Sequence, residues 1–519
     1  MNCDKEKIKI IILIDKKSIN NALEELVTGL KKYFFVNPLI FCEQETLSIN
    51  NKNIFLSFYQ YFDIKLFEKI SIFKNPFNLS NYLFKYISVE ELKSKNFFAD
   101  IVIDLRSEEK YSIEFKFIKL FKLNLTNFAD YYNKIINRSN EQFTFLQIID
   151  TGTNKKYIYS SFERLVSYSF YINQSRSILG WVHRLPYLMS KEFDENNIDS
   201  RQHKPIRKHL DKDTIFRKFI FLKNIFSEIL FKFLRHYLGK DKWFIGIQKN
   251  DENNNQFQIK NNFSIPSHKY DEYLADPFIF SNELSEYLFC ESFSYKANKG
   301  VIKVGKVNEN RECHKLETVL EEKYHLSFPF IFREKGSFWM IPESANNNTI
   351  DLYRSKSFPY GWVKEKTILS GIKAVDSTVL FYEDVFWLFT SFQDKAGMSN
   401  DMHIYWSDDL TGDWKPHKKN PIISDVKISR NAGSIFFYNN KIIRPSQNCL
   451  RRYGEEIIFS EIIMLNKDIY EEKRLLSISP KHIKNSDGIH TWNMSRNKTI
   501  VFDFAKWQLN VMNFFRRLN

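Results

Sequence analysis

The chain of 519 residues has few of the residues that build cysteine-based sites. Only five cysteines occur, Cys3, Cys42, Cys290, Cys313 and Cys449, and no two of them form a Cys-x-x-Cys pair. Zinc clusters and disulfide frameworks need closely spaced or paired cysteines. No Asp-x-Asp motif occurs after residue 242 either, so the sequence predicts no metal site and no disulfide-based fold.

Long apolar runs are also missing. The N-terminal run before Asp15 holds only about seven apolar residues, too few for the core of a signal peptide. No uncharged apolar stretch approaches the roughly 18–20 residues of a membrane span. We therefore expect a cytoplasmic protein, soluble or attached peripherally at the inner face of the membrane.

Negative charge is in short supply. Lys and Arg number 76 against 62 Asp and Glu, which gives a net charge of +14 and a pI of about 9.1. Such a balance favours anionic partners such as phosphates, sugar nucleotides and acidic lipids. No zinc-finger spacing, RNP-like aromatic motif or Arg-rich arm accompanies the charge, so nucleic acid is not an expected partner.

The first 200 residues alternate strand-like and helix-like segments. Strands are predicted at 7–15, 53–62 and 99–107, and helices at 21–35 and 89–97. This alternation predicts an α/β, Rossmann-like domain with a mainly parallel sheet. No Gly-x-Gly-x-x-Gly follows the first strand, so dinucleotide binding is not predicted.

A basic, amphipathic segment follows within a predicted linker over 201–241. Between residues 214 and 238, apolar side chains recur at three- and four-residue steps, accompanied by Arg217, Lys218, Lys223, Lys232 and Arg235. One interpretation is a linker helix packed between domains. The other is a helix lying on an anionic membrane surface. The sequence leaves both open.

From residue 242 to 519 the sequence predicts an all-β domain with an internal repeat. Five similar openings begin the modules: ADPFIF (275–280), SFPFIF (327–332), DSTVLF (376–381), NAGSIFF (431–437) and DGIHTWNM (487–494). A period of about 50 residues is typical of a four-stranded propeller blade. We predict a five-bladed β-propeller, closed by pairing of WFIGIQK (243–249) with the C-terminal strands.

The module openings also carry the candidate site. First strands of propeller blades line the central channel, so polar side chains on them and on the second strands converge there. Carboxylates brought together from separate blades can act as acid, base or nucleophile at a glycosidic centre. An aspartate before a proline, such as Asp276, is by itself a common turn residue. The recurrence of acidic and polar residues at matching positions of the modules favours a functional site. The candidates are Asp276, Asp376, Glu291, Glu343, Gln447, Arg430, Arg444, His325 and His490.

A dozen ordered motifs, among them ADPF, YLFCES, MIPES, DSTVLF, RPSQNC and DGIHT, resemble the glucosamine inositolphosphorylceramide transferase N-terminal family over about residues 242–504. The resemblance implies a propeller-like domain, which in plant members accompanies a separate glycosyltransferase domain not recognised here. Bacterial members join it to a formyltransferase-like domain. Residues 1–200 are similar to a degenerate version of that domain. Because LNLTNFADYYN (123–133) lacks the histidine of the active-site loop, we expect no formyl transfer.

The second half is also similar to five-bladed arabinanase-like and invertase-like hydrolases. That likeness implies that Asp276 is the principal catalytic carboxylate and that Asp376 orients the sugar. Either Glu291 or Glu343 would exchange the proton, and the choice between them stays open.

These observations predict a carbohydrate-active enzyme, in the first instance a glycosyltransferase of cell-surface polysaccharide or glycolipid biosynthesis. A sugar-nucleotide or phosphorylated sugar donor, with phosphate held by Arg430 and Arg444, fits the basic charge, and no further cofactor is expected. His325, Gln447 and His490 would bind the substrate, and a carbohydrate or glycolipid would be the acceptor. The alternatives are a glycoside hydrolase or phosphorylase, and a non-catalytic glycan-binding scaffold.

Overall fold

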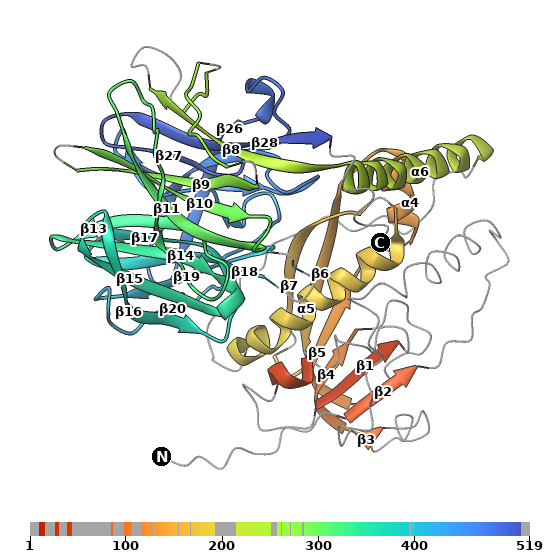
Figure 1. Cartoon of the computed structure of the whole chain (residues 1–519). Helices are drawn as coiled ribbons and strands as arrows, with labels where there is room; N and C mark the ends of the chain where they lie inside the picture. The colour runs from red at the N-terminus through yellow and green to blue at the C-terminus, as the bar shows by residue number, and fades with distance from the viewer. Residues whose placement is uncertain are drawn as a thin grey trace. The chain divides into compact units, whose positions relative to one another are not determined.

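The computed structural model of the protein divides into two compact units, residues 1–229 with 394–398 and residues 230–393 with 399–519 (Figure 1). The residues that the structure describes are 10–15, 26–30, 39–43, 85–86, 98–105, 116–125, 128–153, 155–166, 168–192, 214–250, 257–260, 262–269, 271–282, 285–393, 397 and 399–509.

Seven strands of the first unit, among the residues that the structure describes, form a mixed sheet. Its strand order is β3-β2-β1-β4-β5-β6-β7, parallel from β3 to β5 and antiparallel from β5 to β7. The strands are β1 (Ile10–Asp15), β2 (Leu39–Glu43), β3 (Lys85–Tyr86), β4 (Phe98–Asp104), β5 (Lys116–Asn124), β6 (Glu141–Asp150) and β7 (Lys155–Arg164). The strands predicted at 7–15 and 99–107 form as β1 and β4.

Helices α4 (Phe128–Ile136) and α5 (Phe170–Glu192) belong to the same unit. Trp181 and Leu185 of α5 are buried in one cluster with Ile12 and Ile103 of the sheet, so α5 covers one sheet face. The strand predicted at 53–62 and the helix predicted at 89–97 lie outside the described residues. The Rossmann-like and formyltransferase-like assignments stay predictions.

Helix α6 (Ile215–Leu238) forms over the basic amphipathic segment, as predicted. Among the residues that the structure describes, no helix combines the length and the apolar character needed to cross a bilayer.

The described residues of the second unit form five antiparallel sheets, which confirms the five-bladed propeller. Blade one contains β9 (Glu272–Ser281), β10 (Glu286–Ser294), β11 (Lys299–Val307) and β12 (Glu317–Leu320). Blade two contains β13 (Ser327–Glu334), β14 (Ser337–Ser344), β15 (Thr349–Ser357) and β16 (Tyr360–Ser370). Blade three contains β17 (Ala374–Tyr382), β18 (Val385–Phe392), β19 (Asp401–Ser407), β20 (Lys415–Pro416) and β21 (Ile423–Ser424).

Blade four contains β22 (Arg430–Asn431), β23 (Phe436–Tyr438), β24 (Lys441–Asn448), β25 (Glu456–Leu465) and β26 (Tyr470–Ile478). Blade five is assembled from both ends of the unit: β27 (Trp492–Met494), β28 (Thr499–Leu509) and β8 (Gly239–Lys249). The eleven-residue register from Thr499↔Lys249 to Leu509↔Gly239 closes the ring as predicted. Such closure pairs strand edges that would otherwise be open to other chains.

Candidate active site at the propeller centre

The innermost strands of three blades share a backbone distortion that places the candidate acids. Asp276 in β9, Phe328 in β13 and Asp376 in β17 all have positive φ, of 49°, 43° and 51°. The ladder register shifts at the same places. A bulge of this kind re-aims a side chain, and a left-handed non-glycine residue costs of order 1–3 kcal/mol. In blades one and three the residue that adopts this strained conformation is an aspartate.

The second strand of each blade places a further polar residue beside this distortion. Glu291 faces Ala275, Glu343 faces Ser327 and Gln447 faces Arg430 in the strand registers. In blade three the corresponding position is Ser391, opposite Val375. In blade five it is Asp503, whose backbone N–H donates to the Thr491 carbonyl at 3.1 Å. The second strands therefore present Glu, Glu, Ser, Gln and Asp at one level of the propeller.

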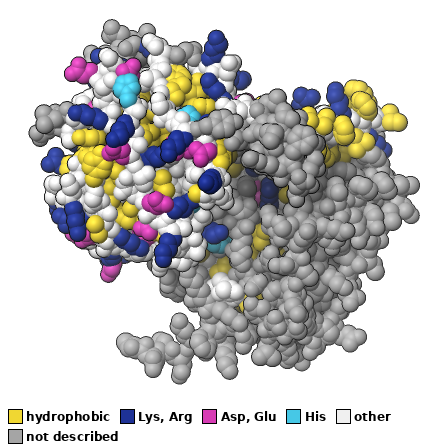
Figure 2. Space-filling model, viewed as in Figure 1, with side chains coloured by type: hydrophobic (Ala, Val, Ile, Leu, Met, Phe, Trp, Pro, Cys, Tyr) yellow, Lys and Arg dark blue, Asp and Glu magenta, His cyan; other side chains and the backbone are white. Residues whose placement is uncertain are grey.

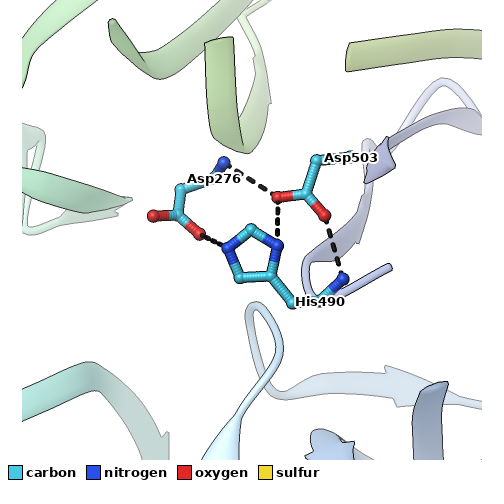
Figure 3. Close-up of side chains that lie close together, drawn as sticks. All are labelled: Asp276, His490 and Asp503. Atoms are coloured by element: carbon cyan, nitrogen blue, oxygen red, sulfur yellow. Dashed lines mark hydrogen bonds and ion pairs between the residues drawn. The ribbon is translucent and has the colours of Figure 1, made fainter. Parts of the chain in front are cut away.

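The first group of the site joins blade one to blade five (Figure 3). His490 lies between two carboxylates, with Nε2 3.0 Å from Asp276 Oδ1 and Nδ1 2.8 Å from Asp503 Oδ2. Asp503 also accepts the backbone N–H groups of Asp276 at 3.0 Å, His490 at 3.0 Å and Thr491 at 2.9 Å. Asp503 thus ties the strand that carries Asp276 to the loop that carries His490.

The histidine of this group is positively charged and Asp276 is an anion. Burial alone would lower the pKa of His490, but the carboxylates of Asp503 and Asp276 raise it well above its ordinary value. Burial alone would raise the pKa of Asp276, but the charge of His490 and hydrogen bonds from His490, Thr491 and the Phe328 N–H lower it. The last two bonds measure 2.7 and 3.2 Å.

Glu291 is held in the opposite ionisation state. Burial, and then the negative charge of Asp276, raise the pKa of Glu291 well above its ordinary value. Its Oε1 has no hydrogen-bond partner among the described residues and lies 3.5 Å from His325 Nε2. His325 Nδ1 accepts the Gly300 N–H at 2.9 Å, so Nε2 carries the ring proton toward Glu291. The buried site thus favours the protonated form of Glu291 and leaves Oε1 without a hydrogen-bond partner among the described residues.

The second group of the site spans blades two, three and four. Asp376 Oδ2 accepts from Arg430 Nε at 2.6 Å and from Gln447 Nε2 at 3.1 Å. Burial raises the pKa of Asp376, and the charge of Arg430 only partly offsets it. Glu343 accepts the Asp376 N–H at 3.2 Å. Burial and then the charge of Asp376 raise the pKa of Glu343 to about 8.

Aromatic rings lie over the first group. Trp243 and Tyr453 have ring centroids 4.1 and 4.9 Å from that of His490. Tyr453 is 44% exposed and also lies over the Arg430 guanidinium, at 5.0 Å. Gly454 permits this approach, because its φ is 65° and a Cβ there would lie 2.8 Å from Trp243 Cη2. The buried acids therefore have an accessible aromatic neighbour.

Eight of the nine predicted residues belong to these groups, and Arg444 does not. Arg444 is fully buried, and its Nε and Nη2 donate to the two Glu472 oxygens at 2.7 and 2.8 Å. Nη2 also donates to the Ile428 carbonyl at 2.8 Å, and Nη1 to Asn431 Oδ1 at 3.3 Å. With its donors engaged inside blade four, Arg444 has a packing role and we leave it out of the site.

Asp503, Thr491, Trp243 and Tyr453 are site residues that the sequence did not single out. A signal for Asp503 existed, since VFDF places an acid in the second strand of module five, as YLFCES and MIPES do in modules one and two. The other three carry no recurring signal. Tyr453 lies in the loop between β24 and β25, and Trp243 lies in β8, far from the module openings in sequence.

One set of side chains has the composition of a metal site. Among the described residues, ligand atoms of Asp276, His490 and Asp503 all lie within 4.8 Å of one another. Each nitrogen of His490 already faces a carboxylate. The protonated ring thereby supplies the positive charge that a cation would bring. The expectation of no metal stays a prediction.

Fold and site together define a five-bladed propeller with a carboxylate-lined, partly protonated centre. Residues 260–510 match the family described as "Glucosamine inositolphosphorylceramide transferase 1, N-terminal". Two relatives carry the name glucosamine inositolphosphorylceramide transferase 1. The Arabidopsis thaliana protein is 35% identical over 238 residues, covering 45% of this chain and 30% of its own. The Oryza sativa subsp. japonica protein is 31% identical over 205 residues, covering 38% and 27%.

These matches confirm the family resemblance for the propeller. The chain spans less than a third of the length of these relatives, and the formyltransferase-like first unit stays a prediction.

Solved structures of similar arrangement include glycoside hydrolases. Zg3597, a family 117 glycoside hydrolase of Zobellia galactanivorans, has 11% identity and a TM-score of 0.33, covering 52% of this chain and 91% of its own. The α-L-arabinofuranosidase PaAbf62A of Podospora anserina has 7% identity and a TM-score of 0.37, covering 46% and 91%. The five-bladed assignment rests on the five sheets described above.

Proposed function

We propose that the propeller centre is a carbohydrate-active site that transfers a sugar from a phosphorylated donor to a glycolipid or polysaccharide acceptor. The observation that carries the proposal is the opposite shift in the pKa values of two neighbouring carboxyl groups, which is lowered for Asp276 and raised for Glu291. Groups whose environments push their pKa values apart supply a base and an acid at one pH. Substitution at an anomeric carbon uses such a pair.

In the proposed reaction Asp276 accepts the proton of the attacking acceptor hydroxyl. Its Oδ2 has one hydrogen-bond partner, the Phe328 N–H, so a lone pair stays available. A bond forms between the acceptor oxygen and the anomeric carbon as the bond to the donor phosphate oxygen breaks. Glu291 or Glu343 gives its proton to that leaving oxygen. Burial raises the pKa of each, to about 8 for Glu343, which favours the protonated form that can give a proton.

The remaining residues would position the sugar. Tyr453 and Trp243 offer ring faces for stacking on a pyranose, a common use of amphipathic aromatic rings. The side chain of His325, 25% exposed, can bind a hydroxyl. Arg430, 15% exposed and paired with Asp376, would hold Asp376 in place and face the donor phosphate.

The acceptor class comes from the matched relatives. Their name contains glucosamine, which is an amino sugar, and inositolphosphorylceramide, which is a phosphorylated sphingolipid. A glycolipid acceptor would suit a chain with a net charge of +14. We therefore place a phosphorylated glycolipid first among the acceptors.

The test is product analysis with the full chain. Purified protein is incubated with a uridine-diphosphate-linked amino sugar and inositolphosphorylceramide in detergent micelles, and products are identified by mass spectrometry. The proposal expects a glycosylated lipid together with free nucleotide. Release of free sugar with no lipid product would show that the protein is a hydrolase and not a transferase. Sugar binding without turnover, unchanged when Asp276, Glu291 and Asp376 are neutralised together, would show a scaffold instead.

A further inference from the structure

Exposed apolar side chains are concentrated on helix α6. Ten of the 20 large apolar side chains that are exposed among the described residues lie on this one helix. Six of these ten are Phe216 at 67%, Phe219 at 64%, Leu222 at 45%, Phe226 at 67%, Leu230 at 44% and Phe233 at 48% exposure. A contiguous apolar patch of this kind marks an interaction site. We call these six residues the α6 apolar face.

The α6 apolar face is one side of a helix whose other side is already packed. The six residues recur at three- and four-residue steps, which places them along one stripe. On the opposite side Phe221 and Ile225 are buried against α4. Arg217 Nη2 donates to Asn133 Oδ1 at 2.7 Å, and Asn224 Nδ2 donates to the Ile135 carbonyl at 2.9 Å. The helix is thus anchored, and its apolar stripe faces outward.

The charge of the helix identifies the partner. The segment IFRKFIFLKNIFSEILFKFLRHYL contains five Lys and Arg residues and one acid, Glu228, which gives +4. At about 100° per residue, Lys223 falls beside the Phe216 edge of the α6 apolar face, and Lys218 falls about 40° beyond its opposite edge. Figure 2 shows apolar side chains gathered on this helix with Lys and Arg side chains at their edges. An apolar stripe with basic borders matches a bilayer surface that carries anionic headgroups.

We propose that α6 lies in the plane of an anionic lipid bilayer, with its apolar face in the acyl boundary and its lysines at the headgroups. The 24 residues of the helix give it a length of about 36 Å. A second copy of the chain is a poorer partner, because two helices of charge +4 would repel each other across the contact. The proposal does not depend on the sugar chemistry of the propeller.

The experiment is co-sedimentation of the full chain with vesicles of phosphatidylcholine alone or mixed with phosphatidylglycerol. The test variant carries Phe219→Glu and Phe226→Glu, and the matched control carries Phe437→Glu, since Phe437 is 58% exposed in the propeller strand β23. Lys223→Glu tests the charge. Circular dichroism and the unfolding midpoint are compared for every variant, so that loss of folding is recognised.

The proposal expects the wild type and the Phe437 variant to bind the mixed vesicles at least about tenfold more strongly than neutral vesicles. Binding should weaken about fivefold or more with Lys223→Glu and should fall as salt rises from about 0.1 M to 0.5 M. The double variant should lose at least about tenfold. Wild-type protein that binds neither vesicle, or a double variant that binds like the control, overturns the proposal. A wild-type dimer that ignores vesicles and becomes monomeric in the double variant also overturns it, in favour of self-association.

Discussion

Replacing His490 with glutamine removes the positive charge between two buried carboxylates. His490 is 2% exposed, Asp276 5% and Asp503 0%, and the ring nitrogens lie 3.0 and 2.8 Å from the two acids. Removing one partner of a buried ion pair costs about 3–5 kcal/mol. At about 2.1 cal/mol/K of unfolding entropy per residue, and with the propeller strands spanning residues 239–509, Tm should fall by roughly 5–9 °C.

The loss should depend on pH with a definite sign. Because the folded pKa of His490 is raised, its stabilisation is fully present below about pH 6.5 and disappears as pH rises through the folded pKa. In the glutamine variant the pKa of Asp276 is expected to rise above its unfolded value, so this variant loses stability as pH rises above about 4. The difference in Tm from wild type should therefore widen from pH 5 to pH 7.

Thermal unfolding followed by tryptophan fluorescence measures this, because the Trp243 ring lies 4.1 Å from that of His490. Gln248→Ala is the control. Gln248 is 4% exposed and does not titrate; its Nε2 donates to the Gln258 carbonyl at 2.8 Å and its Oε1 accepts the Lys260 N–H at 3.0 Å. The loss in Tm of this control should be the same at pH 5 and pH 7. If the loss in Tm of His490→Gln is also the same at pH 5 and pH 7, the charged Asp–His–Asp group is refuted.

Two further predictions concern the same centre. Glu343→Gln should gain stability over wild type as pH rises from about 4.5 to about 8, and the gain should then level off, because the folded pKa of Glu343 is raised to about 8. Urea unfolding at several pH values measures the difference in unfolding free energy. A difference that is constant with pH contradicts the prediction. Gly454→Ala should cost about 1–3 kcal/mol at every pH, because Gly454 has a φ of 65° and a Cβ would lie 2.8 Å from Trp243. Urea unfolding measures this too, and an unchanged midpoint contradicts the close approach.

The architecture of the second unit could be predicted because an internal repeat is recognisable in the sequence. The openings at Asp276 and Asp376 follow the same pattern of polar residues and apolar strand, so both the blades and the level of the acids followed from spacing. Pairing of β8 with β28 followed from the need to close the ring. Glu291 and Glu343 were found for the same reason, since each stands in a second strand.

What the sequence could not supply depends on contacts between distant segments. The role of Arg444 is decided by Glu472, which lies 28 residues away and engages the guanidinium. Nothing in the local sequence distinguishes Arg444 from Arg430, which does reach the centre. The ionisation of Asp276 likewise depends on His490, more than 200 residues away and in contact only after ring closure. Strand patterns do not encode such pairings.

The transfer assay with Asp276→Asn tests the proposed role of Asp276 as the base of a sugar-transfer reaction. Asp351→Asn is the matched control, because Asp351 is also fully buried but is bound by Lys364 at 2.9 Å and Thr367 at 2.7 Å in blade two. We predict that Asp276→Asn lowers kcat about 10²–10⁴-fold. Folded Asp351→Asn should keep kcat within a few-fold of wild type. A folded Asp276→Asn protein that transfers sugar as fast as the Asp351 control would contradict it.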